Sequence, residues 1–186
     1  QYWDALSRLG VDCENRILVD KQPFNTVRLP LIARLFPDAK IIFCLRDPRD
    51  VVLSCFRRRF TANAANAEFL SLDGAAQLYD RVMRLASVYG DRLPLAVHPI
   101  RNEDLVADFD AQMLALCDFA GIEWSGNFRE FAERSAARHV ATPSAPQILK
   151  GLGRDGIGHW RKYESDLAPV LPLLSGWAER FGYDKA

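Results

Sequence analysis

The sequence lacks the signatures by which several large enzyme classes are recognised. It has no GxxxxGK[ST] phosphate-binding loop, no GxGxxG fingerprint following a strand, and no serine nucleophile elbow. Its three histidines and four cysteines show no metal-ligand spacing. No apolar run reaches the ~20 residues that a membrane-spanning helix needs, and the first residues show no signal-peptide pattern. These classes of function are therefore not indicated.

The chain also lacks net charge, with 24 basic and 24 acidic residues. A general electrostatic attraction to nucleic acid or to an anionic membrane is therefore not expected, and any anion site must be a local concentration of arginine. The apolar share of 49% and the charged share of 26% are ordinary for a globular protein. The 186 residues suit one domain, 1–186, with a sizeable core.

The cysteines Cys13, Cys44, Cys55 and Cys117 are widely separated and mostly lie in apolar runs. This pattern favours buried free thiols and a reducing compartment, so we expect a cytoplasmic protein. The sequence opens with "QYWDALSRLG" and no initiator methionine. We therefore expect further sequence upstream.

Strand-like and helical patterns alternate along the chain. Continuous apolar runs predict strands at 16–20, 40–45 and 94–100, the second covered on both faces. Helical spacing predicts helices at 1–10, 29–36, 48–60, 74–93 with Asp73 as the cap, 103–121 in two parts ending at Gly121, 127–136 and 165–183. The small and polar residues of 61–73 predict a surface loop or a flexible lid. The pattern indicates an α/β fold with a parallel sheet.

Basic and hydroxyl side chains follow the second strand. Arg46 stands at its exit, and Ser54 and Arg58 lie four residues apart on one face of the next helix. Because this turn lies at the carboxyl end of a parallel strand, the three side chains suit a phosphate clamp. The alternative is a strand-end arginine paired with Asp47 or Asp50, followed by a solvated basic helix end.

Two further segments carry candidate site residues. Lys21 directly follows the first predicted strand, so it shares a rim with Arg46 if the two strands are parallel neighbours; otherwise it is a surface lysine. The segment "TPSAPQILKGLGRDGIGHWRKY" is rich in glycine and basic residues and could fold over a nucleotide. Its alternative is a plain connection docked through Trp160.

Four segments in order give the chain a resemblance to a known family. "ARLFPDAKIIFCLRDPRDVVLSCF" resembles the 3′-phosphate-binding strand and helix of sulfotransferases that use 3′-phosphoadenosine 5′-phosphosulfate (PAPS). "VDKQPFN", which precedes it, is similar to the family's Asp-Lys-x-Pro segment, and "NEDLVADFDAQMLALCDFAGIEW" and "GHWRKYESDLAPVL" are similar to two later segments. The nearest branches are the bacterial sulfotransferases associated with tetratricopeptide repeats and the protein-tyrosine sulfotransferases. The resemblance covers about Arg16 to Tyr183.

The resemblance implies a P-loop-NTPase-like three-layer sandwich around a central parallel sheet. It implies that Lys21 neutralises charge on the bridging oxygen during sulfuryl transfer and that PAPS is the co-substrate, leaving 3′,5′-adenosine bisphosphate, with no metal. It also implies a set of nucleotide-binding residues: Arg46, Ser54, Arg58, Asn102, Ser144, Gln147, Lys150, Gly153 and His159. The acceptor would carry a hydroxyl or amine: a small molecule, a glycan or a peptide tyrosine. The resemblance also leaves a homodimer open.

The sequence departs from the family pattern in three respects. The family's first strand with its phosphosulfate loop, and its catalytic base, are absent and are expected upstream of Gln1. Asn102 stands where the family usually has tyrosine, and His159 stands where it has lysine or arginine. The chain thus resembles the carboxyl-terminal part of such an enzyme. A P-loop-type kinase and a non-catalytic nucleotide-binding or partner-binding domain stay open as alternatives.

Overall fold

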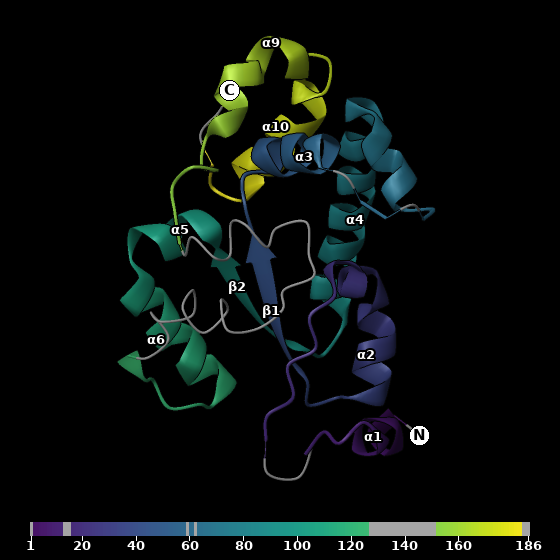
Figure 1. Ribbon diagram of the computed structural model, residues 1–186, viewed down its shortest axis with the longest axis vertical. Helices are drawn as coiled ribbons and strands as arrows, with labels where there is room; N and C mark the ends of the chain where they lie inside the picture. The colour runs from purple at the N-terminus through teal and green to yellow at the C-terminus, as the bar shows by residue number, and fades with distance from the viewer. Residues whose placement is uncertain (1, 13–15, 59, 62, 127–151, 184–186) are drawn as a thin grey trace.

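Two parallel strands form the centre of the molecule. The computed structural model describes residues 2–12, 16–58, 60–61, 63–126 and 152–183 (Figure 1). Strand β1 (Lys40–Leu45) pairs with β2 (Ala96–Arg101) in parallel, from Lys40 opposite Ala96 to Leu45 opposite Arg101. The connection between them is a helical crossover, as parallel pairing requires. The predicted α/β fold with a parallel sheet is confirmed.

Helices lie on both sides of the two strands. The α-helices are α1 (Tyr2–Arg8), α2 (Leu29–Leu35), α3 (Pro48–Arg57), α4 (Leu72–Arg92), α5 (Asn102–Ala107), α6 (Phe109–Ala120), α9 (Glu164–Leu167) and α10 (Leu171–Arg180). The 3-10 helices are η1 (Pro23–Arg28), η2 (Asn66–Leu70) and η4 (His159–Tyr163). Figure 1 shows α5 and α6 on one side of the strands, and α2 and α4 on the other. The strands therefore lie between two helical layers.

The helix ends follow local sequence signals, with one exception to the prediction. Helix α6 ends at Gly121, whose φ of 76° is the left-handed conformation that glycine adopts without strain. The prediction that Asp73 caps α4 is wrong. Ser71 is extended and its hydroxyl accepts from the Gly74 N–H at 3.0 Å, whereas Asp73 lies in the first turn and bonds Gln77. A cap needs an extended backbone, and Ser71 has it.

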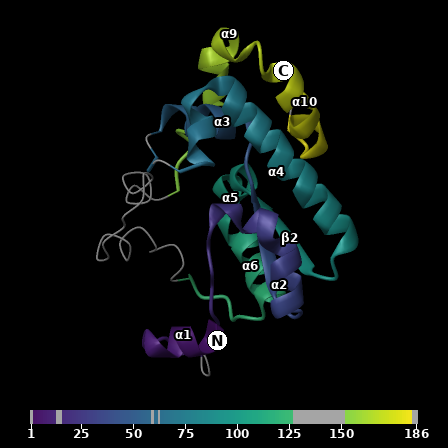
Figure 2. The same cartoon turned by 90° about the vertical axis from the view of Figure 1, so that its right-hand side faces the viewer.

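The main hydrophobic core lies beyond the carboxyl ends of the strands. Figures 1 and 2 show α3, α9 and α10 gathered at that end, beside the upper part of α4. The buried members of this core are Val52, Leu53, Ala75, Ala76, Trp160, Leu167, Val170 and Leu174. Because these residues come from α3, α4 and the last 30 residues or so of the chain, the C-terminal segment is fixed directly onto the helix that follows β1.

Two sequence expectations about strands are wrong. Residues 16–20 form no strand, and Ile17 and Val19 are 64% and 75% exposed. A strand needs a partner for its main-chain groups, and among the described residues the only ladder joins β1 to β2. The prediction that β1 is covered on both faces is also wrong. The exposure of its side chains alternates along the strand, and Ile42 is 40% exposed.

The cysteines differ in exposure. Cys117 is buried and Cys55 is half-buried, but Cys44 on β1 is exposed, so the prediction of buried thiols is wrong for Cys44. Cys13 and the helix predicted at 127–136 lie outside the described residues. Within the described part of the chain, none of the helices has the length and apolarity to cross a bilayer.

The position of the core leads to a test of stability. Leu174 is fully buried in the core on α10, whereas Leu70 is 83% exposed. We expect Leu174→Ala to lower the free energy of unfolding by about 2–5 kcal/mol, because it removes buried methyl groups and leaves a cavity. Leu70→Ala, the control, should cost less than about 0.5 kcal/mol. Urea unfolding measures both, and equal losses would contradict this position of the core.

Candidate functional site

The corner between β1 and α3 is fixed from two directions. The Asp47 side chain accepts from the Arg49 N–H and so caps α3. The Asp47 N–H donates to Glu103 Oε1 at 3.1 Å, and the Tyr183 hydroxyl donates to Glu103 Oε2 at 2.8 Å. Glu103 lies on α5, directly after β2, so the carboxyl ends of both strands meet at this corner. The first turn of α3, with its positive dipole end, is thereby held in place.

A buried ion pair stabilises the first turn of α3. Arg49 is 1% exposed, and its Nε and Nη2 donate to the two Asp47 oxygens at 2.9 and 2.7 Å. Its guanidinium carbon lies 4.1 Å from the centre of the Trp160 ring. Asp47 is therefore engaged by Arg49, so the alternative in which Asp47 pairs with Arg46 is not what the structure shows.

A hollow runs along one face of α3, from Asp50 in its first turn to Arg58 at its carboxyl end. Arg58 Nε donates to Ser54 Oγ at 3.3 Å, one helical turn apart, as the spacing predicts. Arg46 reaches the same hollow from the end of β1. Its complete lining is Arg46, Asp50, Leu53, Ser54, Arg57, Arg58, Asp155, Gly156 and His159. The structure thus brings four of the predicted residues together: Arg46, Ser54, Arg58 and His159.

The C-terminal segment forms the opposite wall of this hollow. Arg46 Nη2 donates to the Gly156 carbonyl. Arg57 Nη1 lies 2.8 Å from His159 Nε2, and because a guanidinium has only donors, this ring nitrogen accepts. The Arg57 guanidinium also lies 5.0 Å from the centre of the Tyr163 ring. This wall therefore presents the Gly156 carbonyl to Arg46 and the His159 imidazole to Arg57.

The charge around the hollow is predominantly positive. Burial raises the pKa of the Cys55 thiol, and the nearby Arg46 and Arg58 guanidinium groups oppose that rise. Burial also raises the pKa of Asp50, while two main-chain N–H groups and Arg46 act in the opposite direction. Three arginines line the hollow against two carboxylates, Asp50 and Asp155. This arrangement can hold a small multivalent anion.

The sequence analysis missed Arg57 and Asp50 as residues of the hollow. The signal was present, since Asp50 and Arg57 lie four residues before and three residues after Ser54 and so share its helix face. Asp155 and Gly156 carried no comparable signal, because they reach the hollow only through tertiary contact.

Other predicted site residues lie elsewhere. Lys21, Asn102 and Gly153 do not line the hollow. Lys21 lies near the carboxyl end of β1, since partial burial raises the pKa of the Cys44 thiol and the Lys21 charge opposes the rise. Asn102 begins α5 directly after β2. Ser144, Gln147 and Lys150 lie outside the described residues.

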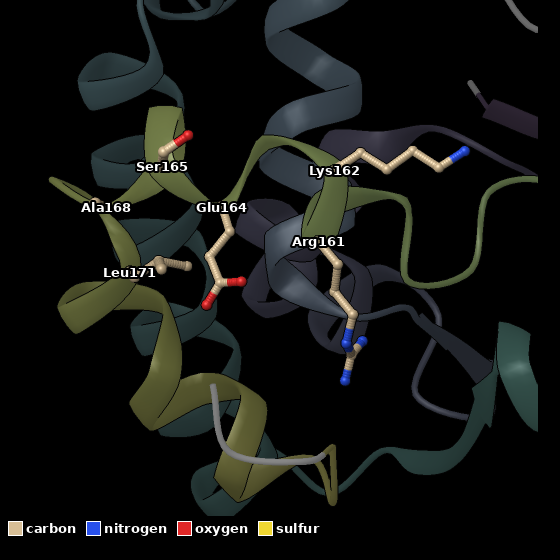
Figure 3. A pocket seen from close by; sticks show the side chains of 6 residues that line it. All are labelled: Arg161, Lys162, Glu164, Ser165, Ala168 and Leu171. Carbon is tan, nitrogen blue, oxygen red and sulfur yellow. The ribbon is translucent and has the colours of Figure 1, made fainter.

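A second depression lies on the outer face of the C-terminal segment. Its lining residues are Arg161, Lys162, Glu164, Ser165, Ala168 and Leu171. Figure 3 shows Lys162 pointing away from Arg161 and Glu164, so the polar groups that line this depression do not converge on one point. In the part of the chain that the structure describes, no group of histidine, cysteine and acidic side chains is placed to hold a metal.

The fold and the hollow define the class of protein: an α/β domain with an arginine-lined hollow where a parallel strand is followed by a helix. A sequence profile of the Sulfotransferase family matches residues 1–126, more than half of the chain. The chain belongs to the Sulfotransferase family, and the resemblance stated from its motifs is confirmed.

Individual relatives agree with this assignment. Protein-tyrosine sulfotransferase 2 of Gallus gallus is 24% identical over 182 residues, covering 91% of this chain and 47% of the relative. Protein-tyrosine sulfotransferase 1 of Danio rerio is 26% identical, with 90% and 48% covered. An uncharacterised protein of Aquifex aeolicus is 27% identical, with 93% and 22% covered. The chain thus spans less than half the length of these relatives.

A solved structure shares the fold. The sulfotransferase domain from the curacin biosynthetic pathway superimposes with a TM-score of 0.67 at 20% identity, covering all of this chain and 68% of that chain. At this identity the likeness shows the fold alone. It confirms the sulfotransferase fold class that the motifs implied.

The buried ion pair under Trp160 gives a second test of stability. Arg49→Ala leaves the Asp47 carboxylate buried without its partner, so we expect a loss of about 3–5 kcal/mol in the free energy of unfolding. The control is Arg81→Ala, because Arg81 pairs with Glu68 at 3.2 Å on the surface. We expect that change to cost about 0–1 kcal/mol. Comparable losses in urea unfolding would show that the Arg49 pair is not important for the corner.

Proposed function

We propose that the protein transfers a sulfuryl group from PAPS to a hydroxyl or amine acceptor. The observation that carries the proposal is that one hollow is lined by Arg46 at the end of β1, by Ser54 in the second half of α3 and by Arg58 at the carboxyl end of that helix, in a chain of the Sulfotransferase family. Guanidinium groups suit a phosphate, because their planar forks donate several charged hydrogen bonds to its oxygens.

The hollow fits the 3′-phosphate of this nucleotide. Arg46 Nε is buried and has no hydrogen-bond partner among the described residues, so it is a donor in need of an acceptor. A phosphate oxygen supplies that acceptor, while Arg58 and the Ser54 hydroxyl offer further donors. A monophosphate lacking the 3′ group leaves this donor unsatisfied, so the site favours the bisphosphate nucleotide.

We assign the rest of the nucleotide contacts to the remaining predicted residues. His159 stands on the wall of the hollow and is next to the 3′ group in this proposal. In this proposal Asn102 and Gly153 contact the nucleoside, together with Ser144, Gln147 and Lys150. The resemblance to the family supports these last assignments.

Lys21 is the catalytic residue in this proposal. When bound, the nucleotide supplies the sulfuryl group, whose bond to the bridging phosphate oxygen breaks as the acceptor oxygen or nitrogen bonds to sulfur. The Lys21 ammonium stabilises the electron pair left on the bridging oxygen, as cations do in phosphoryl transfer. Fixed cations supply this charge without a metal. The acceptor proton passes to a general base, which we place, with the phosphosulfate loop, upstream of Gln1.

The acceptor class is part of the proposal. Two relatives are named protein-tyrosine sulfotransferases, which supports a hydroxyl-bearing acceptor such as a phenol, a glycan or a peptide tyrosine. The cytoplasmic location, the single domain, the homodimer and the tetratricopeptide repeats stay predictions from the sequence.

Calorimetry with 3′,5′-adenosine bisphosphate tests the phosphate site in the full-length protein. We expect binding, and we expect Arg46→Ala to weaken it by about 2–4 kcal/mol, because a buried charge-assisted contact is lost. Arg34→Ala, an exposed arginine on α2, is the control and should leave the affinity unchanged. Equal wild-type affinity for adenosine monophosphate would contradict a dedicated 3′-phosphate site.

Steady-state kinetics test the role of Lys21. We expect Lys21→Ala to lower kcat by about 100-fold or more while the KM for the nucleotide changes little, because the charge acts in the transition state. Lys40→Ala is the control, since Lys40 lies at the opposite, amino end of β1. A parallel loss of kcat and thermal stability in Lys21→Ala would instead make Lys21 a structural residue.

A further inference from the structure

An acidic side chain joins the two walls of the hollow. Asp50 lies in the first turn of α3 and is 1% exposed. Its Oδ2 accepts from the Gly158 N–H at 2.7 Å, and its Oδ1 accepts from the Trp160 N–H at 2.8 Å. These bonds join residues 108 and 110 positions apart in the sequence. One carboxylate thereby fixes the turn that leads into η4.

The position of this carboxylate is electrostatically unfavourable for the proposed ligand. Asp50 lines the same hollow as Arg46, Ser54 and Arg58. A negative charge in a partly desolvated site repels a bound phosphate, so by charge alone Asp50 weakens binding. Its burial adds a desolvation cost, which the two N–H groups and Arg46 offset only in part, so the pKa of Asp50 is raised. An acid in this place therefore needs a structural function that outweighs its charge.

That function follows from what the turn carries. Gly156, two residues before the first bond, accepts from Arg46 Nη2. His159, between the two bonded N–H groups, accepts from Arg57. Trp160 is buried in the core. When Asp50 holds the Gly158 and Trp160 main chain, it also sets the positions of the two groups that direct Arg46 and Arg57 within the hollow.

We propose that Asp50 is a positioning residue of the nucleotide site: by holding the turn from Gly156 to Trp160, its carboxylate fixes the guanidinium of Arg46, which binds the phosphate, and that of Arg57 beside it. This inference rests on the proposed function and deepens it. The affinity for the anion then depends on the Asp50 carboxylate, although that group is itself negative. Asp50 acts by holding the turn of the C-terminal segment that forms the opposite wall of the hollow.

Substitution by asparagine separates the positioning role from the charge, because the two predict opposite signs. Asp50→Asn removes a negative charge beside the anion, so charge alone predicts tighter binding of 3′,5′-adenosine bisphosphate. The amide has one acceptor oxygen, so one of the two N–H groups loses its partner and the turn loosens. We expect binding to be weaker by about tenfold or more, measured by calorimetry on the full-length protein.

The matched control is Asp73→Asn. Asp73 occupies the first turn of α4, as Asp50 does in α3, so both substitutions remove the same favourable interaction with a helix dipole. Asp73 accepts from Gln77 at the surface of the described chain, and its replacement should leave the affinity unchanged. Hydrogen exchange without nucleotide gives the second measurement. We expect faster exchange at the Gly158 and Trp160 amides in Asp50→Asn and wild-type exchange there in Asp73→Asn.

Asp50→Glu keeps the test decisive if the asparagine variant does not fold. It retains the charge but shifts the carboxylate by one methylene, so the positioning role predicts weaker binding and faster exchange, while charge alone predicts no change. Wild-type or tighter binding in a folded Asp50 variant, with the 3′-phosphate preference of the wild type intact, overturns this inference and leaves the proposed function standing. A wild-type protein without that preference overturns both.

Discussion

A pair of hydrogen bonds from the C-terminal segment to a carboxylate on α3 determines the form of the site. The segment that includes Gly158 and Trp160 is far in sequence from α3, yet it lies against the first turn of that helix. The same segment inserts Trp160 into the main core, over the buried Arg49 guanidinium. Polar and apolar contacts therefore fix one turn together. The anion site exists as a hollow with two walls because that turn is fixed.

The buried charges in this region are arranged in two separate layers. Below the surface, Arg49 and Asp47 form an ion pair, and the Arg49 guanidinium lies against the indole of Trp160. At the hollow, the Arg46 Nε has no hydrogen-bond partner among the described residues. The division matters because a guanidinium paired with a carboxylate has less charge to offer a phosphate. The motif "RDPRD" thus contains one arginine for the corner and another that lines the hollow.

The Sulfotransferase family assignment and the local geometry support each other. The family profile covers residues 1–126, and so includes β1, α3 and β2 but not the turn that forms the second wall. The structure adds that turn to the same hollow. The chain spans less than half the length of the tyrosine sulfotransferases it matches, and β1 is only partly covered by the described residues. What the chain itself contributes is the nucleotide-phosphate end of the proposed site.

The sequence by itself determined the local features, because these depend on neighbours within a few residues. The continuous apolar run "KIIFCL" predicted β1, the glycine after α6 predicted its end, and the four-residue spacing predicted the Ser54–Arg58 contact. Tertiary structure decided the rest. Whether residues 16–20 become a strand depends on a pairing partner, and the carboxylate that holds the turn at Gly158 lies more than 100 residues away from that turn. Long-range hydrogen bonds leave no periodic trace in the sequence, so only the folded chain shows them.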